Sequence, residues 1–316
     1  MAKPILTDIL DIKYPIIMAP MFLISNTAMV KEALDGGITG CIPALNYRTI
    51  PELRDAIREI KAYSDKPFGI NLIVNKSNIY YEKQLEACVE EGVDFFITSL
   101  GSPKKTIEMS KPKGIKVFCD VVNVEMAKKC EGLGADGIIA VNSEAGGHSG
   151  KIDGKELVPM IDKAVKIPVI SAGGVATYEQ FQERMSWGAA GCSVGTIFIA
   201  SHEAPVSDDY KQACVDYGAK DIVHTTKLSG TPCTVIKTPY VQKVGTKENI
   251  LEKLMHTNKF FKKYIKMFIS YQGISSLKKA AFNSTYKTVW CAGPTIEDVH
   301  AVRPVSEIVK SLTSGN

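Results

Sequence analysis

Short apolar runs alternate along this chain with longer stretches in which apolar residues recur at the period of a helix. Eight such runs occur before residue 196, at 15–19, 38–42, 67–72, 93–98, 115–119, 136–141, 167–172 and 190–195. Their apolarity is continuous rather than alternating, which is typical of strands that are covered on both faces. The pattern therefore predicts a sheet of eight parallel strands.

The stretches between these runs carry signals for the start and the end of helices. Asn26 is a suitable N-cap for the stretch that ends at Gly36 or Gly37, and Pro51 suits a first helical position. Further stretches that end in glycine are 80–92, 124–134 and 178–188. A strand followed by a helix, repeated eight times, predicts an α/β fold, the (β/α)₈ TIM barrel.

A doubly wound sheet is the alternative fold for such an alternation. It would have fewer strands, with a Rossmann-type glycine turn after the first one. The segment MAPMFLISN, residues 18–26, follows the first apolar run and does not resemble such a turn.

The chain leaves this rhythm after residue 210. Residues 211–287 are long and rich in lysine, and helical spacing returns over 297–313, where we expect the closing helix in spite of Pro304. We therefore expect a barrel formed by 1–210 and 288–316, with 211–287 inserted as a helical, lid-like subdomain. The segment 248–270 in the insertion is strongly amphipathic. We expect it to roof the pocket or to pack against the barrel.

Composition limits the class of protein. The 316 residues are 45% hydrophobic and 23% charged, enough for a full core, and a net charge of +4 is too small to indicate nucleic acid. The eight cysteines form no CxxC pair, as expected for reduced thiols in the cytoplasm. The segment MAKPILTDIL lacks the apolar run of a signal peptide, and no long uncharged apolar stretch predicts a membrane span.

Glycines follow the last two expected strands. The active site of a TIM barrel is formed by the loops at the C-terminal ends of its strands, and the last two loops commonly hold a phosphate. Ala172, Gly173 and Gly174 stand after the seventh run, and Gly195 and Thr196 stand at the end of the eighth. Glycine lets backbone N–H groups approach a phosphate closely, so we expect a phosphate site here. The alternative is that the glycines only permit tight turns.

The segment SEAGGHSG, residues 143–150, follows the sixth run and contains His148. Imidazole has an ordinary pKa of about 6.5, so it can take or give a proton near neutral pH. His148 is therefore the catalytic candidate, the alternative being a histidine that only closes a turn. Glu144 could be its partner or could bind backbone or cofactor hydroxyl groups. No zinc-ligand spacing, HExxH, Walker or GxSxG motif occurs, so no metal is expected.

Six segments resemble, in their order along the chain, the nitronate monooxygenases, formerly called 2-nitropropane dioxygenases. They are PIIMAPM, PFGINL, GADGIIAVNSEAGGHSG, IPVISAGGV, GAAGCSVGTIFIASHEAPVSDDYKQA and VWCAGP, and they span nearly the whole chain. The combination of EAGGH with AGG and GT downstream is specific. The resemblance implies an FMN-dependent TIM barrel with an inserted helical subdomain. It also implies oxidation of alkyl nitronates with O₂ to carbonyl compounds and nitrite.

The resemblance implies a role for each matching residue. His148 matches the base that takes a proton next to a nitro group or orients a nitronate over the flavin. Asn71, in the third run, would contact the flavin ring or its ribityl chain. The other implied cofactor-binding residues are Ala19, Pro20 and Met21 along the ring, Glu144 and Gly147 in the histidine loop, Ala172, and Gly173, Gly174, Gly195 and Thr196 around the phosphate.

Two departures from the family keep the substrate open. Asn142 and Ser143 stand where the family usually has glutamine or glutamate and then glycine, and Thr177 and Tyr178 stand near its usual Asp–Gly pair. The related FMN-type enoyl-ACP reductases share EAGGH, whereas APM looks more like the monooxygenases. The alternatives are therefore an NAD(P)H-dependent flavin reductase acting on quinones, an FMN-type enoyl-ACP reductase, or an FMN-binding interaction protein. The oligomeric state, a homodimer included, also stays open.

Overall fold

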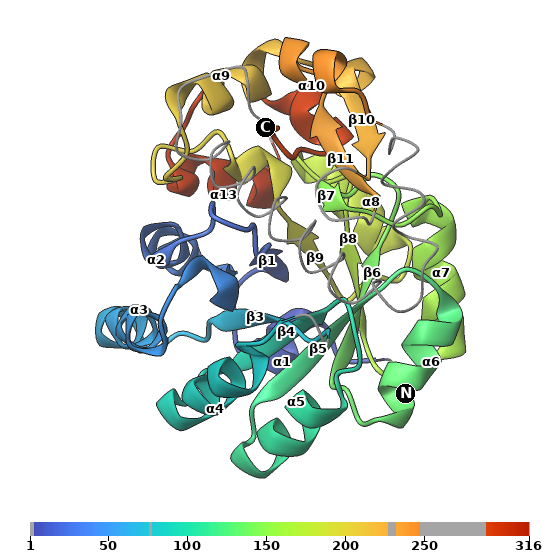
Figure 1. The fold of residues 1–316 in the computed structure, drawn as a ribbon. Helices are drawn as coiled ribbons and strands as arrows, with labels where there is room; N and C mark the ends of the chain where they lie inside the picture. Colours follow the sequence, from blue (N-terminus) through green and yellow to red (C-terminus); the bar gives the residue numbers. More distant parts are fainter. Residues whose placement is uncertain (1–2, 76–77, 227–231, 247–288, 316) are drawn as a thin grey trace, which may run out of the picture.

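Eight parallel strands close into a barrel in the computed structural model of the chain, which describes residues 3–75, 78–226, 232–246 and 289–315 (Figure 1). Each apolar run overlaps one strand, so the predicted TIM barrel is confirmed. In order around the barrel the strands are β1 (Ile16–Met18), β2 (Thr39–Pro43), β3 (Gly69–Ile73), β4 (Phe95–Ser99), β5 (Lys116–Val121), β6 (Gly137–Val141), β8 (Val169–Ala172) and β9 (Gly191–Val194).

Alternate strand residues fill the inside of the barrel. Ile17, Phe95, Phe118, Ile139 and Ile170 belong to one buried cluster there, with the rings of Phe95 and Phe118 edge to face at 5.6 Å between centroids. The remaining side chains of the strands point outward and pack against helices, as continuous apolar runs require. The interior is therefore a packed core, and a ligand can reach only its ends.

Helices surround the barrel and begin and end largely where the sequence signals stand. They are α2 (Thr27–Asp35), α3 (Ile50–Tyr63), α4 (Tyr81–Glu91), α5 (Lys104–Ser110), α6 (Val124–Gly132), α7 (Gly154–Ala164) and α8 (Tyr178–Ser186). Asn26 caps α2 by accepting from the N–H of Met29 at 2.8 Å. Thr49 and Glu52 form a capping box on α3, which places Pro51 second rather than first in that helix.

A five-residue helix, α1 (Leu6–Leu10), closes the N-terminal end of the barrel. The N–H of Leu6 donates to the carbonyl of Ala190, just before β9, at 2.8 Å. Leu6 and Leu10 are buried in the same cluster as the interior side chains. No periodic signal predicts so short a helix. Its burial leaves the C-terminal ends of the strands as the place for a site.

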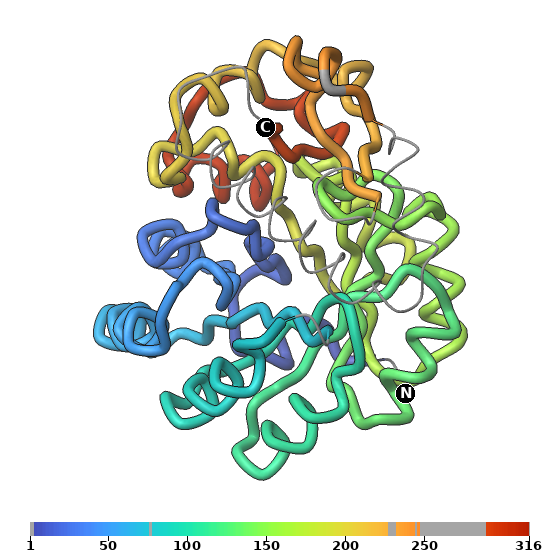
Figure 2. Tube along the Cα trace, in the orientation of Figure 1, coloured from blue at the N-terminus to red at the C-terminus, as the bar shows by residue number. Residues whose placement is uncertain are grey.

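The C-terminal part of the chain covers one side of the barrel (Figure 2). The described part of the expected insertion holds strands as well as helices. The elements here are α9 (Asp208–Asp216), β10 (Ile222–Thr225), β11 (Cys233–Ile236) and α10 (Pro239–Val244), and β11 pairs with β7 (Gly147–His148). The amphipathic segment 248–270 lies outside the described residues, so the expected lid stays a prediction.

The expected closing helix over 297–313 is wrong in its first half. Residues 294–298 form a separate 3₁₀ helix, η5 (Pro294–Asp298), and the closing helix α13 begins at Val305 and ends at Thr313. Pro304 is its N-cap, since a proline has no N–H to donate inside a helix. α13 packs against α2 and α8 and completes the helical ring (Figure 1).

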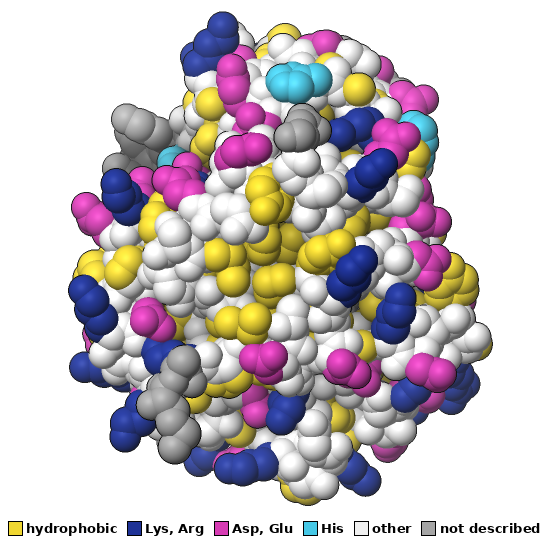
Figure 3. All heavy atoms as spheres, turned by 180° about the vertical axis from the view of Figure 1, so that it is seen from behind, with side chains coloured by type: hydrophobic (Ala, Val, Ile, Leu, Met, Phe, Trp, Pro, Cys, Tyr) yellow, Lys and Arg dark blue, Asp and Glu magenta, His cyan; other side chains and the backbone are white. Residues whose placement is uncertain are grey.

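The surface agrees with the small net charge. On the face shown in Figure 3, basic and acidic side chains are interspersed around a central apolar area, with no extended patch of one sign. All eight cysteines are free thiols. Among the described helices, none combines the length and the apolarity that a membrane crossing would require.

We expect Leu6→Ala to lower the free energy of unfolding by about 3 kcal/mol, because it leaves a cavity between α1 and the barrel interior. Ile79→Ala is the matched control, since Ile79 is 72% exposed, and it should cost less than about 1 kcal/mol. Equilibrium unfolding in urea measures both. Equal losses for the two variants would contradict the sealing role of α1.

Candidate functional site

The loops after β1, β6, β8 and β9 meet at the C-terminal end of the barrel. A Cβ atom added to Gly173, after β8, would lie 2.6 Å from the backbone nitrogen of Ala145, after β6. One added to Gly195, after β9, would lie 3.5 Å from the Cβ of Ala19 and from the Sδ of Met21, after β1. The sequence-predicted residues of these four loops therefore come together.

Asn142 joins the loop after β6 to the loop after β8. Its N–H donates to the carbonyl of Ala172 at 3.0 Å, and its Nδ2 donates to the carbonyl of Gly173 at 3.1 Å. Its Oδ1 accepts from the N–H of Glu144 at 2.9 Å. The side chain is fully buried. The departure from the family pattern at this position is thus a structural link between two loops of the site.

The turn after β8 requires glycine. Gly173 and Gly174 have φ angles of 108° and 78°, which L-residues rarely adopt. A Cβ on Gly174 would also lie 2.3 Å from the Oε2 of Glu144 and 2.4 Å from the Nη2 of Arg184. Close approach and left-handed backbone, rather than a tight turn alone, explain the glycine pair.

Two backbone donors lie at this end of the barrel, directly after β8 and β9. Within the described ranges, the N–H groups of Gly174 and Gly195 donate to no protein group. A 3₁₀ helix, η3 (Thr196–Phe198), begins directly after Gly195. Free N–H groups beside the first turn of a helix suit an anion such as a phosphate.

Glu144 is paired with Arg184, a residue that the sequence analysis missed. The Nη2 of Arg184 lies 3.0 Å from the Oε2 of Glu144 and donates to the carbonyl of Gly174 at 2.7 Å. The guanidinium also stacks on the ring of Trp187, 4.4 Å from its centroid. Arg184 is 5% exposed although it lies on the outer helix α8. Nothing in the helical pattern distinguishes it from a surface arginine.

His148 is held by pairing with a distant segment. In the antiparallel pair of β7 and β11, His148 lies opposite Cys233 and Gly147 lies opposite Thr234. The hydroxyl of Thr234 donates to the carbonyl of Ala145 at 2.9 Å. The side chain of His148 stays accessible to solvent, but desolvation by the surrounding protein lowers its pKa below the ordinary value. A lowered pKa favours the neutral imidazole, which is the form that can accept a proton.

The segment VWCAGP also returns to the site. The N–H of Gly293 donates to the Oγ1 of Thr196 at 3.0 Å. A Cβ on Gly146 would lie 2.9 Å from the nitrogen of Gly293, so the two glycines pass close to each other. Trp290 anchors the segment by stacking on Tyr210 at 5.3 Å between ring centroids. The sequence analysis gave Gly293 no role, although it lies in a motif already noted.

The loop after β1 is fixed by Ser25. Its Oγ accepts from the N–H of Met21 at 2.9 Å and donates to the carbonyl of Ala19 at 2.9 Å. Ala19, Pro20 and Met21 are half-buried beside Gly195. Apolar, partly exposed side chains in this place suit a flat ring system.

Asn71 belongs to a polar chain on the neighbouring strands. Its Nδ2 donates to the carbonyl of Ile97 at 3.0 Å and to the Oγ of Ser99 at 2.8 Å. The hydroxyl of Ser99 donates in turn to the Oδ2 of Asp120 at 2.5 Å. Burial raises the pKa of Asp120 to about 6. Asp120, which directly follows the apolar run 115–119, was missed because it has no motif around it.

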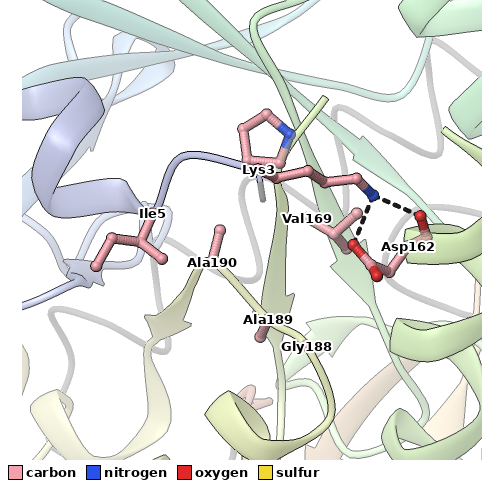
Figure 4. Close-up of a pocket in the computed structure, with 8 residues that line it drawn as sticks. Lys3, Ile5, Asp162, Val169, Gly188, Ala189 and Ala190 are labelled. Atoms are coloured by element: carbon pink, nitrogen blue, oxygen red, sulfur yellow. Dashed lines mark hydrogen bonds and ion pairs between the residues drawn. The ribbon is translucent and has the colours of Figure 1, made fainter. Parts of the chain in front are cut away.

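A cavity of about 420 Å³ lies at the opposite end of the barrel (Figure 4). It is lined by Ala189 and Ala190, before β9, and by Lys3 and Asp162, which pair with each other at 2.6 Å. Its charged groups are thus already satisfied, and the N-terminal end of a TIM barrel serves stability rather than chemistry.

In the described part of the chain, no group of three or more His, Cys, Asp or Glu side chains could hold a metal ion.

Comparison with known proteins shows the family to which the sequence is similar. The family model described as "Nitronate monooxygenase" matches residues 3–315. A "Probable nitronate monooxygenase" of Staphylococcus saprophyticus is 29% identical over an alignment 284 residues long. The alignment covers 76% of this chain and 80% of that protein. A Mycobacterium tuberculosis protein named "(3aS,4S,5R,7aS)-5-hydroxy-7a-methyl-1-oxo-octahydro-1H-indene-4-carboxyl-CoA dehydrogenase" is 30% identical over 242 residues, which cover 76% of this chain and 67% of that protein.

Two solved structures share the fold over nearly the whole chain. FabK from Thermotoga maritima has a TM-score of 0.84 and 29% identity, covering 97% of this chain and 94% of its own. A nitroalkane oxidase from Streptomyces ansochromogenes has a TM-score of 0.81, covering 97% of this chain and 96% of its own. Its identity is 20%, so it supports the fold alone.

We expect Gly174→Ala to destabilise the protein by about 3 kcal/mol, because left-handed strain is added to a clash with Glu144 and Arg184. Gly114→Ala is the matched control, since Gly114 has a φ of 71° and nothing within 4 Å of an added Cβ. It should cost only the strain, about 1 kcal/mol. Thermal or urea unfolding distinguishes the two, and equal effects would show that the clash is relieved by movement.

Proposed function

The chain belongs to the nitronate monooxygenase family and is an oxidoreductase, and we propose that it binds FMN at the C-terminal end of the barrel and oxidises alkyl nitronates. O₂ is the acceptor, and the products are a carbonyl compound and nitrite. The observation that carries the proposal is that two parts of the site meet. The glycine cradle, formed by Gly173 and Gly174 after β8 and Gly195 after β9, lies against the loop that contains His148. The contact is made by Gly173 with Ala145.

The residues present fit a flavin mononucleotide. The N–H groups of Gly174 and Gly195 and the first turn of η3 at Thr196 would hold its phosphate. Ala19 and Met21 would lie along its ring, and Asn71 offers a polar contact at the same end of the barrel. When bound, FMN would supply the redox chemistry that protein side chains lack.

His148 would move the proton. Its lowered pKa keeps the imidazole neutral, so it can accept a proton from the carbon next to a nitro group or orient a nitronate already formed. The pairing of β7 with β11 fixes the backbone that carries it. Restricting this backbone places the base before the substrate arrives.

Redox chemistry on an acyl thioester is the second candidate. The relative named as a carboxyl-CoA dehydrogenase, at 30% identity, favours it. The flavin would then be reduced by NAD(P)H, as in the quinone-reductase alternative.

The non-enzymatic alternative is not kept, because the family is one of oxidoreductases. A cytoplasmic location and a homodimer stay predictions.

We expect the purified protein to be yellow and to lose its flavin absorbance under argon on addition of an alkyl nitronate. His148→Asn should bind FMN with unchanged affinity but slow the anaerobic reduction by a nitroalkane about 100-fold or more. His224→Asn, on the accessible face of β10, is the control and should react as the native protein does. Reduction by NAD(P)H alone would favour the second candidate instead, and a protein that takes up no FMN would contradict both.

We expect kcat/KM for a neutral nitroalkane to stay high as the pH falls through about 6.5 and to decline only below it. The reason is that the lowered pKa of His148 keeps the imidazole unprotonated to more acidic pH. A pH–rate profile measures this decline of kcat/KM at acidic pH. The decline should be absent from the residual activity of His148→Asn. A decline that begins well above pH 6.5 would assign the base to another group.

A further inference from the structure

Asn71, Ser99 and Asp120 stand at inward positions near the C-terminal ends of three adjacent strands. Ile97 and Phe118 lie in the interior cluster, and Ser99 and Asp120 follow them by two residues, which returns a side chain to the same face. Asn71 is in register with Ile97 and so points the same way. The three side chains therefore form a polar floor under the mouth of the barrel.

The hydrogen bonds within this floor use up the donors of its side chains. The carbonyl of Ile97 and the hydroxyl of Ser99 take both hydrogens of the Asn71 amide, which leaves its oxygen for the site. Ser99 uses its own hydrogen toward Asp120. The donors of both side chains are thus used within the floor, which offers acceptors and negative charge to whatever lies above it.

The carboxyl group of Asp120 has no cationic partner in the described ranges, where no lysine, arginine or histidine lies within 4.0 Å of it. The titratable groups coupled to it are the thiols of Cys41 on β2 and Cys119 on β5, both with raised pKa values and so uncharged. The neighbouring inward groups are otherwise apolar, with Val141 on β6 beside the same cluster. Among the described residues, the charge on Asp120 is therefore compensated by the hydroxyl of Ser99 alone.

We propose that Asp120 is a positioning residue that sets the charge preference of the FMN site, so that its carboxylate disfavours negative charge on the bound flavin ring. The inference rests on the proposed function, since it needs FMN in the barrel mouth. Coulomb repulsion acts over several ångströms in a site shielded from water, so direct contact with the ring is not needed. Oxidised, neutral flavin would then be held more tightly than any anionic form of it.

Sulfite addition to the bound flavin tests this without turnover. Sulfite forms a bond from its sulfur lone pair to the flavin ring, the adduct carries the negative charge, and the visible absorbance is lost. We expect Asp120→Asn to bind sulfite about tenfold more tightly than the native protein at pH 8, because the repulsion is removed. At pH 5 the difference should fall to within about twofold, because a group with a pKa of about 6 is then protonated in the native protein as well.

Ser99→Ala is the second variant and needs no change at Asp120. The Ser99 hydroxyl lowers the pKa of Asp120, so its removal should move the pH at which sulfite affinity changes to a higher value. Glu108→Gln is the control for a carboxyl outside the site, on α5 with a 61% exposed side chain, and should leave sulfite affinity unchanged. Fluorescence quenching of oxidised FMN checks that every variant still binds the cofactor.

The outcomes separate the two proposals. Equal sulfite affinities of Asp120→Asn and the native protein at pH 8, with FMN bound in both, would overturn the role of Asp120 alone. A pH-independent gain in Asp120→Asn, or an unmoved transition in Ser99→Ala, would likewise show a structural effect and overturn it. Failure of the native protein to bind FMN would overturn the proposed function and this inference with it.

Discussion

The close approach of the loops after β6 and β8 is the constraint on which the site depends. The buried amide of Asn142 binds the backbone of both loops, and its Oδ1 lies where a side chain at Gly173 would stand, 2.1 Å from an added Cβ. Asparagine at 142 and glycine at 173 are therefore one structural requirement. Among the described residues the N–H group of Gly174, next along the chain, has no acceptor, so under the proposed function it would be available to the phosphate.

The charges at the mouth of the barrel are arranged unequally. Arg184 donates to the carbonyl of Gly174 beside the backbone donors, and its charge is balanced there by Glu144 and Glu183. On β5, two strands away around the barrel, Asp120 has the hydroxyl of Ser99 and, among the described residues, no cationic partner. Backbone N–H groups favour an anionic group at the first place, and the carboxylate disfavours one at the second. A ligand with a phosphate at one end and an uncharged ring at the other matches this gradient.

The sequence is most informative where the physical signal is local. Continuous apolar runs and the glycines that end helices are signals carried by residues adjacent in the sequence, so they predict eight strands and most of the helices. Once the strands were placed, the glycines and the histidine that follow them could be singled out. The five residues of α1 are too few to show a period, and Pro304 was treated as an interruption of a helix rather than its start. Arg184 and Asp120 are themselves buried and bind partners on other elements, and no pattern along the chain records such contacts.

Under the proposed function, the base and the cofactor would be supported by different parts of the chain. The glycine cradle is formed by strands of the barrel, whereas His148 is aligned by Cys233 and Thr234, from the segment that follows the barrel's last strand. The same segment also reaches the loop beside the glycines, because the hydroxyl of Thr234 donates to the carbonyl of Ala145, which lies against Gly173. A fold in which FMN is held by the barrel and the proton-transferring group by an added segment can keep its redox chemistry while its substrate changes, as the different names of its relatives suggest.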